Sequence, residues 1–190
     1  MRSETTEKHK KLSSNDITCG IITLSDTITT NEDDLSGQYL ANELSKRYQL
    51  KSKIIIPDEK KALIESIEKM IENNIEVILT TGGTGLDSRD ITVETVESIF
   101  DKKIEGFGEI FRHQSFLEIG SGALISRATA GVYKKTVIFS MPGSPNAVKT
   151  ALNIRTHTHT LTPAKAFFTI AKSAKLLINA AIAVIIIREG

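Results

Sequence analysis

The chain of 190 residues contains one cysteine, four prolines, no tryptophan and only 5% aromatic residues. A single cysteine excludes a disulfide framework within the chain, which fits a reducing cytoplasm. Cys19 lies in the apolar run 17–24, which favours a buried strand thiol over a nucleophile or a metal ligand. No apolar run reaches the roughly 20 residues of a membrane-spanning helix. We therefore expect a cytoplasmic protein with no membrane segment.

Charge of one sign is also missing from part of the chain. The formal net charge is +1 and the isoelectric point is near 7.8, and no Lys/Arg run is interleaved with aromatic residues, so a nucleic-acid partner is not expected. No Asp or Glu lies between Ile119 and Arg188. The stretch after Leu152 adds the repeat Thr156-His-Thr-His-Thr160 and a terminal apolar run, 176–187.

These patterns predict one domain between two atypical ends. With 40% apolar residues, the chain can bury a single core. We expect a polar tail over residues 1–15, without the apolar core of a secretory signal, then a domain over 16–152 and an atypical tail over 153–190. We interpret the last segment as a frameshift, a sequence error or a recent replacement.

Hydrophobic spacing within the domain alternates between strand and helix. Apolar runs predict strands over 17–24, 53–56 and 75–80, while helical spacing appears over 35–48, 63–71 and 93–100. This order predicts βαβ units and a largely parallel sheet. Further along, 123–132 and 136–141 are expected to form an antiparallel pair, with Lys134 and Lys135 in the turn.

A glycine-rich loop follows the third predicted strand and is the most informative segment. Thr80-Thr-Gly-Gly-Thr-Gly85 has three glycines in four positions, and Arg89-Asp90 follows. Small residues let a ligand approach the backbone, so the N–H groups of Gly82, Gly83, Thr84 and Gly85 could bind phosphate, helped by hydroxyls such as that of Thr81. The alternative is a tight turn that needs positive φ. We expect Thr92 to cap the following helix.

A second strand-to-helix loop has a similar design. Met141-Pro-Gly-Ser-Pro145 places Ser144 as a helix cap and Pro145 at the first helical position. The loop is either a second anion site, made by Pro142, Gly143 and Ser144, or a capped helix start without a ligand.

Carboxylates lie at the ends of the predicted parallel strands. Ser25-Asp26 ends the first strand, Pro57-Asp58 ends the second, and Asp90 follows the glycine loop. Carboxylates repel phosphates unless a cation lies between them, and Mg²⁺ typically joins one or two carboxylates to phosphate oxygens. The pattern therefore predicts a magnesium-assisted phosphate site. Other acidic residues, Asp33, Asp34, Glu59 and Asp87, are expected in solvated loops or helix starts.

Several of these motifs together resemble the MoaB/MogA family of molybdenum cofactor biosynthesis. The resemblance covers about 16–152 and is carried by Thr80–Gly85, Arg89-Asp-Ile-Thr92, Glu105-Gly-Phe-Gly-Glu109, Ser126-Arg-Ala-Thr-Ala-Gly131 and Met141-Pro-Gly-Ser144. Asp33-Asp34 with Ser36-Gly37 is closer to the MoaB branch. The resemblance implies a three-layer α/β/α sandwich with a mostly parallel sheet.

The resemblance also implies an activity, which is adenylylation of molybdopterin by ATP with Mg²⁺, releasing pyrophosphate. Asp58 and Asp90 match the two functional aspartates of the family, and we assign both to catalysis and to metal binding. Ser25 and Asp26, with the two loops above, would complete the nucleotide and pterin site. A homo-oligomer, either a trimer or a hexamer, is expected.

Two other functions stay open at this point. The chain could bind molybdopterin without catalysis, or hydrolyse a nucleotide as the related CinA amino-terminal domain does. The motifs Arg89-Asp-Ile-Thr92 and Glu105-Gly-Phe-Gly108 favour the adenylyltransferase over the hydrolase.

Overall fold

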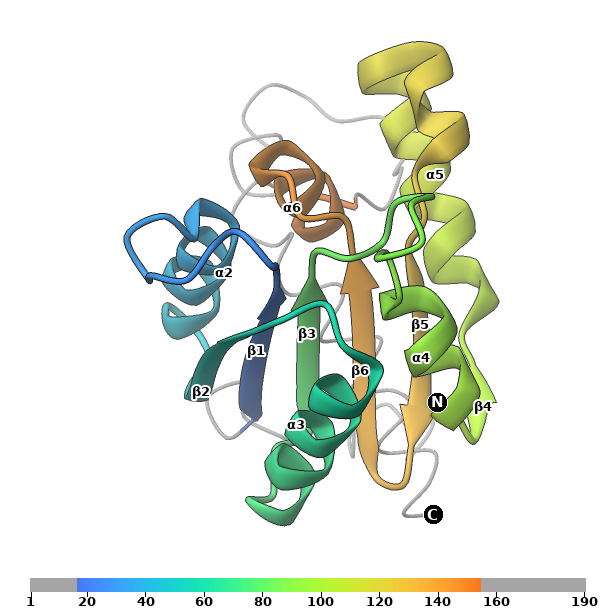
Figure 1. Ribbon diagram of the computed structural model, residues 1–190. Helices are drawn as coiled ribbons and strands as arrows, with labels where there is room; N and C mark the ends of the chain where they lie inside the picture. Colours follow the sequence, from blue (N-terminus) through green and yellow to red (C-terminus); the bar gives the residue numbers. More distant parts are fainter. Residues whose placement is uncertain (1–16, 155–190) are drawn as a thin grey trace, which may run out of the picture.

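A computed structural model describes residues 17–154 of the chain (Figure 1). The predicted tail over 1–15 and nearly all of that over 153–190 lie outside these residues. In chain order the elements are β1 (Thr18–Leu24), α2 (Leu35–Ser45), β2 (Gln49–Ile56), α3 (Lys60–Glu72), β3 (Val77–Thr81), α4 (Thr92–Ile99), β4 (Lys102–Lys103), α5 (Glu105–Ile119), the 3₁₀ helix η2 (Gly120–Ile125), β5 (Thr129–Tyr133), β6 (Thr136–Met141) and α6 (Pro145–Leu152).

The strands form one six-stranded sheet in the order β2-β1-β3-β6-β5-β4. β2, β1, β3 and β6 run parallel, whereas β5 and β4 pair antiparallel at one side. The predicted mostly parallel sheet and the hairpin at Lys134 are confirmed. Parallel strands end at the same edge of a sheet, so the loops after β1, β2, β3 and β6 all emerge together.

Helices cover both faces of the sheet, which makes the predicted three-layer α/β/α sandwich (Figure 1). On one face, Leu44 of α2, Phe111 of α5 and Val148 of α6 pack with Leu79 and Phe139 of the sheet. On the other face the core is smaller, and α3 and α4 supply its helical side chains, Leu63, Ile67, Met70 and Val96. The central strands β3 and β6 are buried along their whole length, as expected for strands covered on both faces.

Cys19 is a buried strand residue, as its apolar neighbours predict. Its side chain is fully buried in β1, and burial raises the pKa of its thiol to about 12, with a smaller contribution from Glu76. A thiol so far from ionisation is a poor nucleophile.

Asp34 stands at a helix start, as one of the two predicted placements, and caps α2. It is fully buried, and its carboxylate accepts from Gly37 N at 2.8 Å and pairs with Lys53 Nζ at 2.7 Å. Two other local predictions differ from the structure. Residues 123–125 belong to η2, so strand β5 begins only at Thr129. Thr92 is the first residue of α4 rather than its cap, and the cap position, Ile91, offers no side-chain hydrogen bond.

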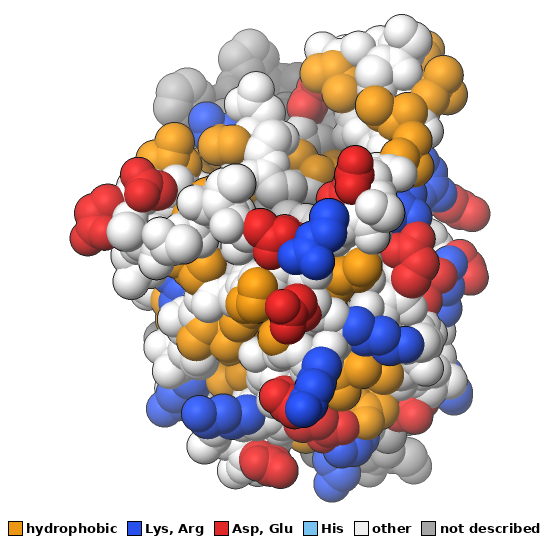
Figure 2. Space-filling model, viewed as in Figure 1, with side chains coloured by type: hydrophobic (Ala, Val, Ile, Leu, Met, Phe, Trp, Pro, Cys, Tyr) orange, Lys and Arg blue, Asp and Glu red, His pale blue; other side chains and the backbone are white. Residues whose placement is uncertain are grey.

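The end of α5 projects beyond the sheet together with η2 (Figure 1). Most of the large apolar side chains that stay exposed belong to this projection: Ile110, Phe116, Leu117, Ile119, Leu124 and Ile125. Apolar side chains gather on the projection in Figure 2 as well. Over residues 17–154, no helix has both the length and the apolar character needed to cross a membrane.

Candidate active site

The loops after the four parallel strands bring the predicted site residues to one edge of the sheet. Asp26 follows β1, Asp58 follows β2, the glycine loop follows β3, and Gly143 follows β6. The loops touch one another, because Ser25 N donates to Ile56 O at 3.0 Å and Gly82 N donates to Met141 O at 3.2 Å. Segments distant in the sequence thus form one continuous surface.

The glycine loop has a backbone that only glycine accommodates. Gly82 and Gly83 have φ of 100° and 59°. A Cβ atom on Gly82 would lie 2.1 Å from Leu24 O, and one on Gly83 would lie 2.5 Å from both Asp58 Oδ1 and Thr92 Oγ1. Within the described part of the chain, the N–H groups of Gly83, Thr84 and Gly85 donate no hydrogen bond. The loop therefore offers a row of backbone donors, as a phosphate cradle requires.

Threonine hydroxyls hold this cradle in place. Thr92 Oγ1 donates to Gly82 O at 2.8 Å, and Thr92 N donates to Gly83 O at 2.8 Å. Thr81, which we predicted to contact substrate, is fully buried and donates to Pro142 O at 3.1 Å. Thr84 is buried as well. The Thr92 hydroxyl therefore supports the cradle backbone, and the Thr81 hydroxyl ties the end of β3 to the loop after β6. Substrate contacts by Thr81 and Thr84 stay predictions.

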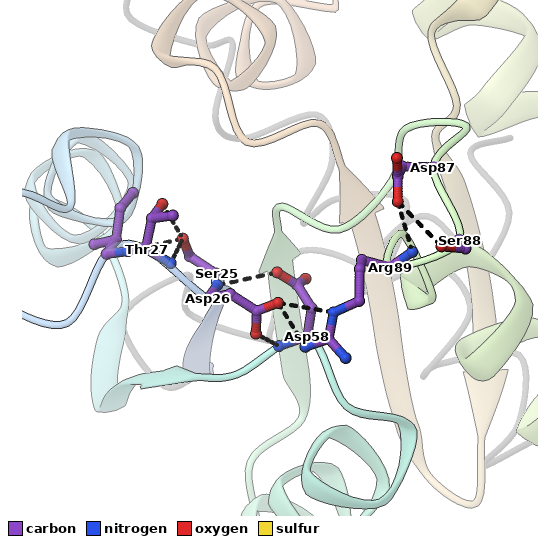
Figure 3. Close-up of polar contacts among 8 residues, drawn as sticks. Ser25, Asp26, Thr27, Asp58, Asp87, Ser88 and Arg89 are labelled. Atoms are coloured by element: carbon purple, nitrogen blue, oxygen red, sulfur yellow. Dashed lines mark hydrogen bonds and ion pairs between the residues drawn. The ribbon is translucent and has the colours of Figure 1, made fainter.

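Asp26 and Asp58 lie side by side and exchange hydrogen bonds. Asp26 N donates to Asp58 Oδ2 at 3.1 Å, and Asp58 N donates to Asp26 Oδ1 at 3.0 Å (Figure 3). The other oxygen, Asp58 Oδ1, is buried and accepts no hydrogen bond within residues 17–154. Its position against Gly83 directs an unused carboxylate oxygen toward the cradle.

The two carboxyl groups differ in acidity. Desolvation raises the pKa of Asp58, the charge of Asp26 raises it further, and Asp90 adds a smaller effect. The Arg89 guanidinium lowers the pKa of Asp26, helped by the backbone N–H of Asp58. Asp58 is thus a carboxylate with unfavourable surroundings, of the kind that a cation would relieve.

Asp90 lies against the cradle at Gly85, whereas Asp58 lies against it at Gly83. Its Oδ2 accepts from Asp87 N at 2.9 Å, and a Cβ atom on Gly85 would lie 2.5 Å from that oxygen. The neighbouring Arg89 extends back over the site and donates from Nε to Asp26 Oδ2 at 2.9 Å (Figure 3). The carboxylates predicted from separate motifs are therefore assembled around one loop, with one guanidinium among them.

The fit of this arrangement to Mg²⁺ rests on Asp58 Oδ1. Within the described residues there is no group of three or more His, Cys, Asp or Glu side chains placed to hold a metal ion. Mg²⁺ does not need one, because it usually keeps several waters and takes one or two carboxylates with substrate phosphates. A buried carboxylate oxygen without a partner beside a phosphate cradle fits that use.

The second loop begins a capped helix. Ser144 Oγ accepts from Ala147 N at 3.1 Å, and Pro145 occupies the first turn of α6. Gly143 O accepts from Ser36 Oγ at 2.7 Å, which ties this loop to α2. Ser25 likewise uses its oxygen within its own loop, accepting from Ile28 N at 2.9 Å. Substrate contacts by Ser25, Gly143 and Ser144 stay predictions.

Arg127 links the cradle to a neighbouring hollow. Its Nε donates to Thr84 O at 2.9 Å, and its guanidinium pairs with Glu94 of α4. The hollow, of about 280 Å³, lies between α4, α5 and β5 and is lined by Val93, Glu97, Lys103, Ile104, Glu105, Gly108, Arg112, Leu124, Ser126, Arg127, Ala128 and Thr129. Two motifs of the family resemblance, around Glu105 and Ser126, therefore meet in one cavity.

Sequence reasoning assigned no role to Arg89, Arg127 or Ser36. Both arginines belong to motifs that carried the family resemblance, and this membership is the sequence feature that could have indicated a role for them. Nothing in the sequence shows that Arg89 reaches Asp26, because that contact depends on the order β2-β1-β3.

Comparison with known proteins decides the family. Residues 20–158 match the family described as a probable molybdopterin binding domain of molybdenum cofactor biosynthesis. The chain belongs to this family. The molybdenum cofactor biosynthesis protein B of Staphylococcus carnosus is 44% identical over 143 residues, 73% of this chain and 83% of the relative. The molybdopterin adenylyltransferase of Pyrococcus furiosus is 41% identical over 153 residues, 78% of this chain and 90% of the relative.

Solved structures agree with the MoaB/MogA resemblance. A crystal structure of molybdenum cofactor biosynthesis protein B has a TM-score of 0.70 at 38% identity, covering 84% of this chain and 97% of its own. A MogA structure has a TM-score of 0.64 at 24% identity, over 72% of this chain and 91% of its own, which shows the common fold alone.

Proposed function

We propose that this member of the family is a molybdopterin adenylyltransferase. The single observation that carries the proposal is the placement of Asp58 beside Gly83 and of Asp90 beside Gly85, in a cradle whose N–H groups at Gly83, Thr84 and Gly85 have no partner within residues 17–154. The name of the Pyrococcus furiosus relative supports it. ATP and molybdopterin are the proposed substrates.

In the proposed reaction, a phosphate oxygen of molybdopterin attacks the α-phosphorus of ATP. The bond from that phosphorus to the bridging oxygen breaks, which gives adenylylated molybdopterin and pyrophosphate. The N–H groups of Gly83, Thr84 and Gly85 bind the phosphate oxygens and hold the reacting groups in line. Asp58 and Asp90 would hold Mg²⁺, which neutralises charge on the phosphates and on the departing pyrophosphate.

Different surroundings of the cradle suit the two substrates. Asp26 follows β1, the loop with Gly143 and Ser144 follows β6, and we place the nucleotide at the cradle between these two loops. The hollow between α4, α5 and β5 contains Arg112, which forms no ion pair or hydrogen bond within residues 17–154. This cavity gives room for the pterin, with its phosphate reaching the cradle past Arg127.

Pyrophosphate release tests the proposal directly. We expect the full chain to release pyrophosphate from ATP only when molybdopterin and Mg²⁺ are both present. Asp58→Asn and Asp90→Asn should each lower that rate by about a hundredfold or more, because each removes charge from the metal site while keeping its shape.

A matched control and two contrary outcomes complete the experiment. Asp33→Asn removes one exposed carboxylate of a neighbouring loop and should leave the rate within about twofold, as expected for a surface change. Tight molybdopterin binding without turnover would make the chain a binding module instead. Pyrophosphate or phosphate release without molybdopterin would support a nucleotide hydrolase.

We also propose that the chain forms a homo-oligomer, with a trimer or a hexamer expected. The exposed apolar residues of α5 and η2 support this, because monomers seldom leave such a patch in water. Leu117→Ser with Leu124→Ser should lower the mass measured by light scattering, and a wild-type monomer would contradict the proposal. A cytoplasmic location likewise stays a prediction from the single cysteine.

A further inference from the structure

The side chain of Arg89 lies across the candidate site without a role in the reaction as proposed so far. Arg89 is 59% exposed and Asp26 is 39% exposed in their side chains. Arg89 Nε and Nη2 both donate to the same oxygen, Asp26 Oδ2, at 2.9 and 2.5 Å (Figure 3). Nη1 donates no hydrogen bond within residues 17–154. The pair therefore uses only part of the donor capacity of a guanidinium.

Arg89 is one of two arginines beside the candidate site, and it is the one paired with a carboxylate of that site, whereas Arg127 pairs with Glu94. Asp26, Asp58 and Asp90 bring three carboxylates to this edge, and Arg89 is the basic residue hydrogen-bonded to one of them. A nucleotide triphosphate adds further negative charge, so the guanidinium and a metal ion are both needed to balance it. In the structure, however, the guanidinium is turned toward Asp26.

The contact with Asp26 is one that a ligand can displace. An exposed ion pair contributes little stability, whereas a guanidinium binds phosphate through two parallel hydrogen bonds that are roughly twice as strong as neutral ones. A cation bound beside Asp26 and Asp58 would take over the neutralisation that Arg89 now provides for Asp26. Arg89 would then be released on the side that faces the phosphates.

We propose that Arg89 is a phosphate-binding residue that Asp26 holds in reserve, and that metal binding beside Asp58 frees it to contact the nucleotide triphosphate. The inference rests on the proposed nucleotide site and assigns a specificity residue to it. Arg89 selects ligands with a phosphate chain. Asp26 delays that contact until the cation has arrived, so nucleotide and metal bind cooperatively.

A double-mutant cycle on the full chain tests the exchange through binding rather than turnover. The dissociation constant for ATP is measured by calorimetry in EDTA for wild type, Asp26→Asn, Arg89→Gln and the double variant. Asp26→Asn alone removes a repelling charge and so tightens ATP binding to some extent in any case. If Asp26 also restrains Arg89, the tightening should be at least about fivefold larger when Arg89 is present than in the Arg89→Gln background.

Adding saturating Mg²⁺ provides the second measurement. Because the cation frees Arg89 in the wild type, the additional tightening of ATP binding that Asp26→Asn causes when Arg89 is present should shrink toward onefold. Under the same conditions Arg89→Gln should weaken Mg·ATP binding by about tenfold. Arg89→Lys should recover only part of that loss, because lysine lacks the planar fork. A merely structural ion pair would give neither the metal dependence nor the partial rescue.

Matched controls separate the exchange from general charge effects. Asp33→Asn removes a carboxylate from the same connecting loop, and Lys135→Gln removes an exposed cation at the distant β5–β6 turn. Neither should show coupling to Arg89. Equal tightening in both backgrounds, or a coupling that Mg²⁺ leaves unchanged, overturns the inference.

Failure of the inference is distinguishable from failure of the proposed function. If wild type releases pyrophosphate but the cycle shows no coupling, only the role of Arg89 is lost. If the coupling appears but no pyrophosphate is released with molybdopterin, the adenylyltransferase proposal fails while the nucleotide site stands. If wild type does not bind ATP at all, both are wrong.

Discussion

Two strand-to-helix loops meet at the candidate site, and they start their helices in different ways. The β3–α4 loop has two glycines with positive φ, and no side chain caps α4. The β6–α6 loop has two prolines, and Ser144 caps α6. At the start of α6, Ala147 N has a partner in Ser144 Oγ, whereas the N–H groups of Gly83, Thr84 and Gly85 have none within residues 17–154. We therefore expect the anion at the first loop, while substrate contacts by Pro142, Gly143 and Ser144 in the second stay predictions.

The two loops also differ in the carboxylates that lie beside them. Asp58 and Asp90 border the glycine loop, and Asp26 borders Asp58. Around the second loop, the side chains that hydrogen-bond to its backbone are the neutral Ser36 and Thr81. Two loops that look alike as patterns of glycine, serine and proline therefore differ in the charge placed around them, and the predictions that follow use matched changes in the two loops.

The largest expected difference comes from adding one methyl group to each loop. Gly82→Ala should lower the free energy of unfolding by about 3 kcal/mol or more, because its φ is 100° and the new Cβ would lie 2.1 Å from Leu24 O. Gly143→Ala should cost less, about 1 to 2 kcal/mol, because its φ is not positive and the new Cβ would lie 3.1 Å from Gly82 Cα, a tight contact that a small shift relieves. Urea unfolding measures both, and equal losses would contradict the contrast.

Removing one hydroxyl from each helix start should separate binding from stability. Thr92→Val deletes the buried bond to Gly82 O and should cost about 1 to 2 kcal/mol while also weakening ATP binding, since the cradle loses its support. Ser144→Ala should cost about 1 kcal/mol through the lost cap, with ATP affinity nearly unchanged. Thermal unfolding and calorimetry of both variants provide the measurements. An equal loss of ATP affinity in both would show that the second loop binds the nucleotide too.

The smallest effect concerns pH and the charge beside the glycine loop. The folded protein raises the pKa of Asp58 above its ordinary value, mainly by desolvation, so its ionisation destabilises the folded state. Asp58→Asn should therefore raise the melting temperature slightly at neutral pH in EDTA. This gain in melting temperature should disappear as the pH falls through the raised pKa of Asp58 in the folded protein toward the ordinary pKa of aspartate, because the carboxyl group is then protonated in both states. A melting temperature that falls on this substitution at neutral pH would show that the carboxylate stabilises the fold.

The sequence predicted the parallel half of the fold well because its strands and helices differ clearly in spacing. It missed α5, in which Gly106 and Gly108 occupy the first turn and Phe116 and Leu117 face outward, so no single apolar face is evident. It also predicted strand for Ala123–Ile125, where apolar residues form η2 instead. Composition alone does not distinguish those two conformations.

The candidate site was predictable as a set of residues but not as a set of contacts. Glycine spacing and carboxylates at strand ends indicated Gly83, Asp58 and Asp90, and the structure brings them together. Local patterns could not show that Thr92 would bond to Gly82 O instead of capping α4, or that Arg89 would turn toward Asp26. Both contacts arise from tertiary arrangement, which local sequence does not encode.

The arrangement of four parallel strands ending at one edge also has a consequence for folding. The proposed nucleotide site requires the loops after β1, β2, β3 and β6 at once, and β6 joins β3 only after the chain has passed through α4, α5 and β5. A partly folded chain that lacks β6 has no complete site and gains nothing from ATP. Ligand binding therefore stabilises the finished sheet as a whole, and bound nucleotide should slow hydrogen exchange in strands far from the loops that touch it.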